Sequence, residues 1–413
     1  MINLNLKDTL KYKINQASLL LLAFILPLHK ALIVPLIFIL FLTSLFNIKN
    51  KSTFQNSSFI HHFSIASLFI LMILGLLWTR NMDWAFKNLE IKFSIIAFPI
   101  IMYLSNLKWS EVTPKVLMAF IEGCILSCFL LLLMALYYYL GTGDSNQFFY
   151  TQLSIMHHPS YMAMYTCFSI CLVYLFSFSP KVSTHIKPIW ALLILIFLSI
   201  FTLLLASKTG LISILIIHFS ALSYWIIKHN KFKAGIISIA VIISIGMGGY
   251  FSSTFIQTRI NELFITDDDL PANSSTSIRL VAWNSSMDLI SKAPILGVGT
   301  GDAKDALSKE FLESGQFKLV EKSLNAHNQF LQMGIQLGII GLLIFIFTLI
   351  LPAILLWKQN FAPALFLALI LIINGMTEAW LETQSGVIFF AFFTTLFWCY
   401  YQEIRDQQLI SIE

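Results

Sequence analysis

Long apolar runs recur along almost the whole chain, and they limit what it can fold into. A run of about 20 mostly apolar residues can cross a lipid bilayer as a helix. Only 11% of the residues are charged, against about 25% in soluble domains, so these runs cannot all be covered by a water-exposed surface. We therefore expect an all-α integral membrane protein, because a helix satisfies its own backbone hydrogen bonds in lipid.

About twelve apolar segments are candidate membrane-spanning helices, although the first and fourth are short for that role. They are Ala17–Leu28, Ala31–Asn47, Phe63–Trp78, Phe93–Leu104, Val116–Leu140, Ser160–Phe178, Pro188–Leu205, Leu211–Ile227, Ala234–Phe251, Phe330–Trp357, Phe361–Met376 and Gly386–Tyr401. The first two could instead form one hairpin that dips into the membrane. One long loop interrupts the series, so we divide the chain into spans 1–9 (1–251), the loop (252–326), and spans 10–12 with a tail (327–413).

Basic residues are distributed unevenly between the two sides that this span count defines. With a cytoplasmic N-terminus, 14 of the 26 Lys and Arg residues fall in cytoplasmic segments, and the opposite short loops hold only Lys30, Arg80, Lys87, Lys92 and Lys208. The positive-inside rule applies to such short loops and not to the long one. Both termini are therefore predicted to be cytoplasmic, with the long loop on the outer side. The net charge of +5 follows from this bias, so we expect no nucleic-acid partner.

The long loop is predicted to contain several short elements. Thr266–Ser277, with three aspartates and several serines, is typical of a flexible, lid-like segment. Ile278–Ser291 has an amphipathic helical pattern, and Asp302 is placed to cap a helix that runs through Glu313. Between them, the glycines of Pro294–Gly301 resemble a phosphate-binding loop but lack its lysine, so we interpret this segment as a sharp turn.

A set of polar residues falls on the predicted outer face. The set comprises Arg80, His157, His158, Lys208, Arg279, Trp283, His327, Asn328, Glu378 and Glu382. Each also has a plainer interpretation: Arg80 and Trp283 as interfacial anchors, the adjacent histidines as solvated loop residues, and the glutamates as partners for charges on neighbouring loops. Lys208 is harder to explain in this way, because ionisable residues at membrane depth are usually functional. The five cysteines lie in apolar runs and are interpreted as packing residues, and we expect no metal site.

These residue types suit one kind of chemistry. Fixed cations that face outward beside lipid can neutralise a diphosphate, and arginine offers a planar fork of donors to its oxygens. A neutral histidine nearby can accept the proton of an attacking hydroxyl. Because nucleotides are absent from that side of the membrane, a lipid-activated sugar donor is the expected substrate.

Two stretches resemble the O-antigen ligase and polymerase superfamily. Ser277–Asp302, SIRLVAWNSSMDLISKAPILGVGTGD, has the family's Arg-x-x-x-Trp and Pro-x-x-Gly-x-Gly pattern. Ala326–Leu343, AHNQFLQMGIQLGIIGLL, resembles its His-Asn-x-x-Leu motif, which leads into a glycine-spotted helix. The resemblance implies a GT-C-like glycosyltransferase of the bacterial inner membrane that needs no metal or cofactor. Its donor would be a glycan on undecaprenyl diphosphate, and its acceptor the lipid A core or a growing glycan.

The resemblance also implies roles for individual residues. Arg279 would bind the diphosphate, and His327 would serve the acceptor hydroxyl as base or positioner. Lys208 stands where many members have an arginine, so it keeps the charge without the bidentate geometry. Arg80, as a diphosphate ligand, and Glu378, as a catalytic carboxylate, are less specific matches. His158, Trp283, Asn328 and Glu382 are left as acceptor-binding or structural residues.

Three functions remain open from the sequence: ligase, polymerase of the same superfamily, and transporter or flippase. Donor binding is common to the first two, and the length of the loop favours the ligase. A transporter would place its ionisable residues near mid-bilayer, whereas here they gather at one face, with Glu122 the main exception.

Overall fold

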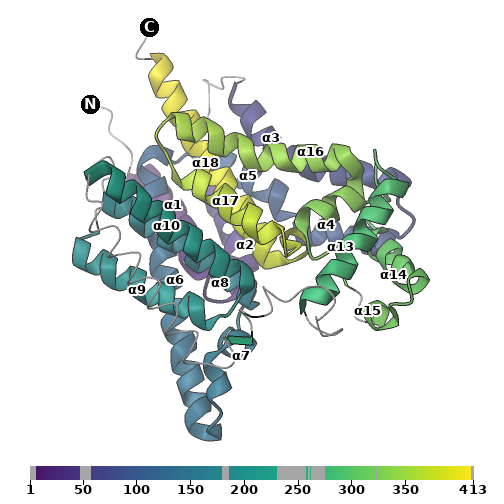
Figure 1. Ribbon diagram of the computed structural model, residues 1–413. Coiled ribbons are helices and arrows are strands. Elements are labelled where there is room, and N and C mark those ends of the chain that lie inside the picture. The colour runs from purple at the N-terminus through teal and green to yellow at the C-terminus, as the bar shows by residue number, and fades with distance from the viewer. Residues whose placement is uncertain are drawn as a thin grey trace. The chain divides into compact units, whose positions relative to one another are not determined.

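The computed structural model describes residues 6–46, 57–178, 186–229, 257–258, 261, 275–321 and 324–410. Within these residues the chain is helical and contains no strand, as predicted (Figure 1). Among these residues, five helices are long and apolar enough to cross a membrane: Trp109–Thr142, Pro159–Ser177, Lys208–Ile227, Gln329–Lys358 and Gln384–Leu409. Shorter apolar helices cover Lys30–Phe46, Ser64–Trp78, Pro188–Leu204 and Pro363–Gly375. The chain is thus an integral, multi-pass membrane protein. The predicted ninth span, 234–251, and most of the predicted lid lie outside the described residues.

The chain divides into two compact units. The first combines Met1–Ala119 with Ser277–Glu413, and the second is Phe120–Thr276. The first unit holds α1 (Leu6–Ile25), α2 (Lys30–Phe46), α3 (Ser57–Leu74), η1 (Gly75–Trp78), α4 (Met82–Lys92), α5 (Ser94–Leu104), the start of α6 (Trp109–Thr142), most of α13 (Ser275–Lys292), α14 (Ala303–Glu313), α15 (Phe317–Glu321), α16 (Gln329–Lys358), α17 (Pro363–Gly375), η4 (Trp380–Glu382) and α18 (Gln384–Ile410).

The second unit contains the rest of α6, η2 (Ser145–Phe148), α7 (Tyr150–Leu153), α8 (Pro159–Phe178), α9 (Pro188–Leu204) and α10 (Lys208–His229). α8 packs against both α9 and α10. Small residues allow this close approach: Gly210 of α10 faces Ala163 of α8, and the hydroxyls of Thr166 and Thr202 lie 2.8 Å apart. The cysteines of α6 and α8 are buried here at helix contacts, consistent with packing.

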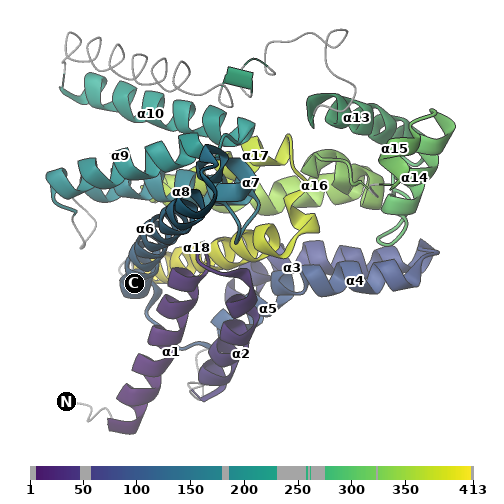
Figure 2. The ribbon, with the colours of Figure 1, turned by 90° about the horizontal axis from the view of Figure 1, so that it is seen from below.

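α18 forms the centre of the first unit. Its side chains from Val387 to Trp398 are almost completely buried, and it packs against α3, α5, α16 and α17. A helix that is apolar on all sides is buried in this way because no face is left for water. α16 and α17 lie side by side in both views of the ribbon (Figures 1 and 2).

The glycine-rich segment forms a sharp turn, as predicted, and it packs into a break in α16. Gly338 interrupts α16 with φ of 61°, and Gly297 and Gly299 also have positive φ. The backbone N–H groups of Val298 and Gly299 donate to the carbonyls of Ile335 and Gln336, at 2.8 and 3.0 Å. The turn therefore satisfies carbonyl groups that the broken helix leaves open.

Three helices of the predicted loop gather at one end of the first unit (Figures 1 and 2). α13, α14 and α15 share a small apolar core that includes Leu289, Leu307 and Phe311. α13 and α14 confirm the predicted helices. The prediction for Asp302 was wrong: it precedes α14, but its side chain does not cap that helix. Its carboxylate instead accepts from the backbone N–H groups of Arg80 and Asn81 at 2.8 and 2.7 Å, which ties the loop to the start of α4.

α4 replaces the polar loop expected between the third and fourth predicted spans. It runs from Met82 to Lys92, and α5 begins two residues later. The ammonium of Lys92 is fully buried and lies 2.8 Å from Glu382 Oε1, so its charge is compensated. A search for apolar runs does not find α4, because the burial of Lys92 depends on Glu382, which is remote in sequence.

Candidate active site

Arg279 and Glu378 form the best-defined polar contact among the predicted site residues. Arg279 projects from α13, and its Nη2 donates to Glu378 Oε1 at 2.8 Å. Its Nε donates to the carbonyl of Thr377 at 3.0 Å, so two donors of the guanidinium are used. Only 18% of the Arg279 side chain and 12% of the Glu378 side chain are exposed. The arginine is thus held in one orientation, and the Glu378 carboxylate balances its charge.

His327 lies on the other side of the same carboxylate. Its Nδ1 is 3.9 Å from Glu378 Oε2, which is beyond hydrogen-bond distance, and this buried nitrogen has no hydrogen-bond partner among the described residues. The backbone of His327 has φ of 46°, a left-handed conformation that non-glycine residues seldom adopt and that often marks functional sites. Glu378 therefore stands between a cation and a histidine, with one oxygen toward each.

Neighbouring side chains hold the turn that carries His327. Asn325 Oδ1 accepts from the His327 backbone N–H at 2.9 Å, and Trp283 Nε1 donates to the His327 carbonyl at 3.4 Å. Asn328 caps α16 by accepting from two backbone N–H groups, and its Nδ2 donates to the carbonyl of Met376 at 3.1 Å. Trp283 and Asn328 thus both contact backbone groups here, and the choice between acceptor-binding and structural roles stays a prediction for both.

Glu382 does not join this cluster. Its Oε1 accepts from the buried Lys92 ammonium and from Gln336 Nε2, the latter at 3.2 Å. Lys92 Nζ also donates to Asn88 Oδ1. A buried ammonium without such partners would be strongly destabilising, so the contact with Glu382 stabilises the fold here. Whether Glu382 also binds the acceptor stays a prediction.

Arg80 is exposed, and no contact in the described part of the chain joins it to Arg279, His327 or Glu378. Its backbone N–H is held by Asp302, which fixes the start of α4 and leaves the guanidinium at the surface. Its predicted diphosphate contact stays a prediction.

Three of the predicted residues lie in the second unit. Lys208 is the first residue of α10, and its Nζ donates to Thr276 Oγ1 at 2.5 Å. His157 is buried with its ring against Tyr165, and the exposed His158 contacts the rings of Tyr150 and Tyr161. Their part in the site stays a prediction.

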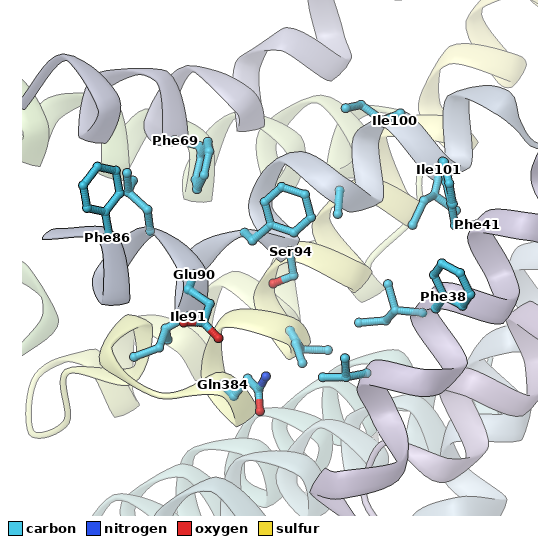
Figure 3. Close-up of a pocket in the computed structure, with 16 residues that line it drawn as sticks. Phe38, Phe41, Phe69, Phe86, Glu90, Ile91, Ser94, Ile100, Ile101 and Gln384 are labelled. Atoms are coloured by element: carbon cyan, nitrogen blue, oxygen red, sulfur yellow. The ribbon is translucent and has the colours of Figure 1, made fainter. Parts of the chain in front are cut away.

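Two of the pockets formed by described residues of the first unit have a lining residue in common. A polar cavity of about 180 Å³ is lined by Trp84, Asn88, Ile91, Ala303, Lys304, Asn325, Gln332, Gln336 and Glu382. An apolar pocket of about 910 Å³ lies among α2, α3, α4, α5 and α18. In Figure 3 the polar groups of Glu90, Ser94 and Gln384 lie in the middle of the apolar pocket, with aromatic rings to either side. Ile91 lines both pockets.

Comparison with known families gives one match, which contains half of the ten predicted site residues. Residues 193–346 match the O-antigen ligase family. This stretch, which is less than half of the chain, is therefore similar to that family. No curated protein matches the chain.

The matched region includes Lys208, Arg279, Trp283, His327 and Asn328. Glu378, which pairs with Arg279 and lies 3.9 Å from His327 Nδ1, follows the matched region in sequence. The Arg279–Glu378–His327 cluster thus combines residues of the matched region with one residue that follows it.

Sequence reasoning missed the polar face of α4. Trp84, Asn88 and Lys92 are spaced four residues apart, so they share one face of the helix. Phe86 and Phe93, which line the apolar pocket, fall elsewhere on this stretch. The four-residue spacing indicates a helix with a polar face, whereas the span count places Lys92 in a loop.

Proposed function

We propose that the chain is an O-antigen ligase-like glycosyltransferase. It transfers a glycan from undecaprenyl diphosphate to an acceptor hydroxyl, on the lipid A core or a similar acceptor, without a metal. The observation that carries the proposal is the Arg279–Glu378–His327 cluster, whose arginine and histidine lie in the region that matches the O-antigen ligase family. The alternative within the family is a polymerase that uses the same donor and extends the glycan itself.

In this mechanism the diphosphate displaces the Glu378 carboxylate as the hydrogen-bond partner of the Arg279 guanidinium. Arg279 already presents two donors in one plane, the geometry that phosphate oxygens accept. Its charge neutralises the leaving group as the bond between the anomeric carbon and the diphosphate oxygen breaks. Arg80 and Lys208 are proposed as further diphosphate ligands.

The same displacement frees Glu378 for His327. The carboxylate and Nδ1 are separated by 3.9 Å, so a small adjustment brings them into hydrogen-bond distance. Glu378 then orients the imidazole, and Nε2 accepts the proton of the acceptor hydroxyl as its oxygen bonds to the anomeric carbon. The electron pair of the broken bond remains on the undecaprenyl diphosphate.

The apolar pocket supports a lipid-linked substrate. Its volume of about 910 Å³ and its aromatic and aliphatic lining suit a hydrocarbon chain. The lipid chain of one of the two substrates is proposed to lie there.

Substitution of the cluster tests the proposal. Arg279→Ala and His327→Ala are each expected to lower transfer in reconstituted membranes by about 100-fold or more, the usual contribution of a general base or a charge-stabilising donor. Lys309→Ala, at a side chain that is 78% exposed on α14, is the matched control and should retain full activity. Thermal unfolding checks that each variant is folded. Full activity of both site variants would remove the basis of the proposal.

The glycan profile of a deletion strain separates the two family functions. A ligase predicts loss of all capped lipid core, with long lipid-linked glycan accumulating. A lipid core capped with single repeats would instead indicate the polymerase.

The proposal includes the twelve-span topology, the division at 252–326, and a site on the periplasmic face of the inner membrane. The native cysteines are buried, so single introduced cysteines can report sidedness. Lys309→Cys should react with an impermeant maleimide in intact spheroplasts, and Lys358→Cys, exposed at the end of α16, only after permeabilisation. The reverse labelling pattern would show that the topology is opposite to the one proposed.

A further inference from the structure

The polar cavity beside α4 has the composition of a carbohydrate-binding site. Four amide side chains line it: Asn88 from α4, Asn325 from the turn before α16, and Gln332 and Gln336 from α16. The Trp84 ring and the Glu382 carboxylate complete the polar lining. Amides offer both donors and acceptors, as sugar hydroxyls require, and an indole face packs against the apolar C–H face of a sugar ring.

Several of these polar groups have unused hydrogen-bonding capacity. Gln336 is 99% buried, and its Oε1 has no hydrogen-bond partner in the part of the chain that is described. Asn325 and Gln332 use their carbonyl oxygens to hold the backbone N–H groups of His327 and Ala326, and no hydrogen bond from either NH₂ group occurs within the described residues. A buried polar atom without a partner is costly, so a ligand that supplies hydroxyl groups is favoured.

The charges of the cavity favour a neutral ligand. The carboxylate of Glu382 is balanced by Lys92, whose ammonium lies 2.8 Å away. Lys304, which lines the cavity, and Lys87 both lie over the Trp84 ring, at 4.1 and 4.8 Å from its centre. Ammonium groups held at an aromatic ring beside a carboxylate are poor receptors for a diphosphate, which binds best where several donors converge.

The size of the cavity limits the ligand further. A cavity of about 180 Å³ is smaller than the roughly 300–1,000 Å³ of pockets that hold drug-sized ligands. This volume suits a single sugar ring and is too small for a lipid chain.

We propose that this cavity binds one sugar ring of a substrate glycan. The inference rests on the proposed glycosyl transfer and adds a subsite to it. Asn325 connects the two, because it lines the cavity and also holds the backbone of His327. The ring belongs either to the donor glycan near its diphosphate or to the end of the acceptor, and both present the same hydroxyl chemistry.

Two variants test the subsite without touching the Arg279–Glu378–His327 cluster. Trp84→Ala removes the stacking surface, and Gln336→Leu removes the unpaired buried oxygen while keeping the side-chain size. Each is expected to raise KM about tenfold for one substrate, donor or acceptor, with a smaller change in kcat. The substrate whose KM rises identifies the source of the ring. Lys309→Ala serves again as the control.

A binding measurement makes the test independent of activity. Saturation-transfer NMR on the full-length protein in nanodiscs would use methyl glycosides of common hexoses and N-acetylhexosamines as probes. At least one glycoside should bind the wild type and His327→Ala equally, and should lose its signal with Trp84→Ala and Gln336→Leu. Wild-type KM values in both cavity variants, or glycoside binding that neither variant weakens, would overturn the subsite. If His327→Ala remains active while the cavity variants lose binding, the transfer mechanism fails and the sugar site stands.

Discussion

Nη2 of Arg279 lies 2.8 Å from Oε1 of Glu378, so the cation proposed to bind the diphosphate is already engaged by a carboxylate. A diphosphate must compete with Glu378 for the guanidinium. Glu378→Gln keeps the size of the side chain but weakens this competitor, since a neutral acceptor binds arginine less strongly. We predict a lower KM for the donor together with a kcat reduced by about tenfold or more, because His327 loses its orienting carboxylate.

Steady-state kinetics with the donor varied at saturating acceptor measure this effect. Glu313→Gln, at an exposed carboxylate on α14, is the control. A higher donor KM with an unchanged kcat would mean that Glu378 contacts the donor directly.

His327 provides an imidazole and also has an unusual backbone conformation, and different substitutions can test the two features separately. Asparagine tolerates the left-handed region better than most residues, whereas a β-branched residue does not. His327→Asn is therefore predicted to unfold at the wild-type temperature and to have no transfer activity. His327→Val should be inactive and also less stable, by about 1–3 kcal/mol. Thermal unfolding and transfer assays on both variants decide this, and equal stability of the two would show that the backbone conformation carries no cost.

The Lys92–Glu382 pair is predicted to be structural. Lys92 is fully buried, so Glu382→Leu leaves an ammonium without its counter-charge and should cost about 3–5 kcal/mol. The double variant Lys92→Met/Glu382→Leu removes both charges and should recover most of that loss. Unfolding of the single and double variants provides the measurement, and additive losses would mean that the two charges do not compensate each other.

Two glycine-to-alanine substitutions, one in the glycine-rich turn and one in α6, are predicted to have opposite effects on stability. Gly297 has φ of 68°, and a Cβ there would meet the backbone of Ile335 and Gln336, so Gly297→Ala should strongly destabilise the fold. Gly141 lies in α6 with nothing nearby, and alanine there should stabilise the helix by about 0.5–1 kcal/mol. Unfolding temperatures compare the two, and a neutral Gly297→Ala would show that the turn can move away from α16.

The helices that sequence predicted well are those whose signal is local. Apolar composition marks α16 and α18, and amphipathic spacing marks α13, because each pattern lies within one segment. α4 was missed because the burial of Lys92 depends on Glu382, 290 residues away. Asp302 was assigned to the wrong partner for the same reason, since its acceptor oxygens face Arg80 and Asn81, more than 200 residues earlier.

For the site, sequence predicted the residue types but not their grouping. Arg279 and His327 were paired through their motifs, and the structure adds Glu378 between them. Glu382, only four residues later, serves a different network. No sequence rule separates these two glutamates, because the end of α17 and the short helix η4 direct them to different neighbours.

Ile91 lines both the apolar pocket and the polar cavity, so α4 contributes to an apolar and a polar environment at once. Phe86, Leu89 and Phe93 line the apolar pocket, Trp84 and Asn88 line the polar cavity, and Ile91 reaches both. An amphiphile could therefore place its hydrocarbon tail in the apolar pocket and its hydrated head in the polar cavity without leaving the bilayer. A bulkier or smaller residue at position 91 would then change the boundary itself, and with it the length of molecule that fits across.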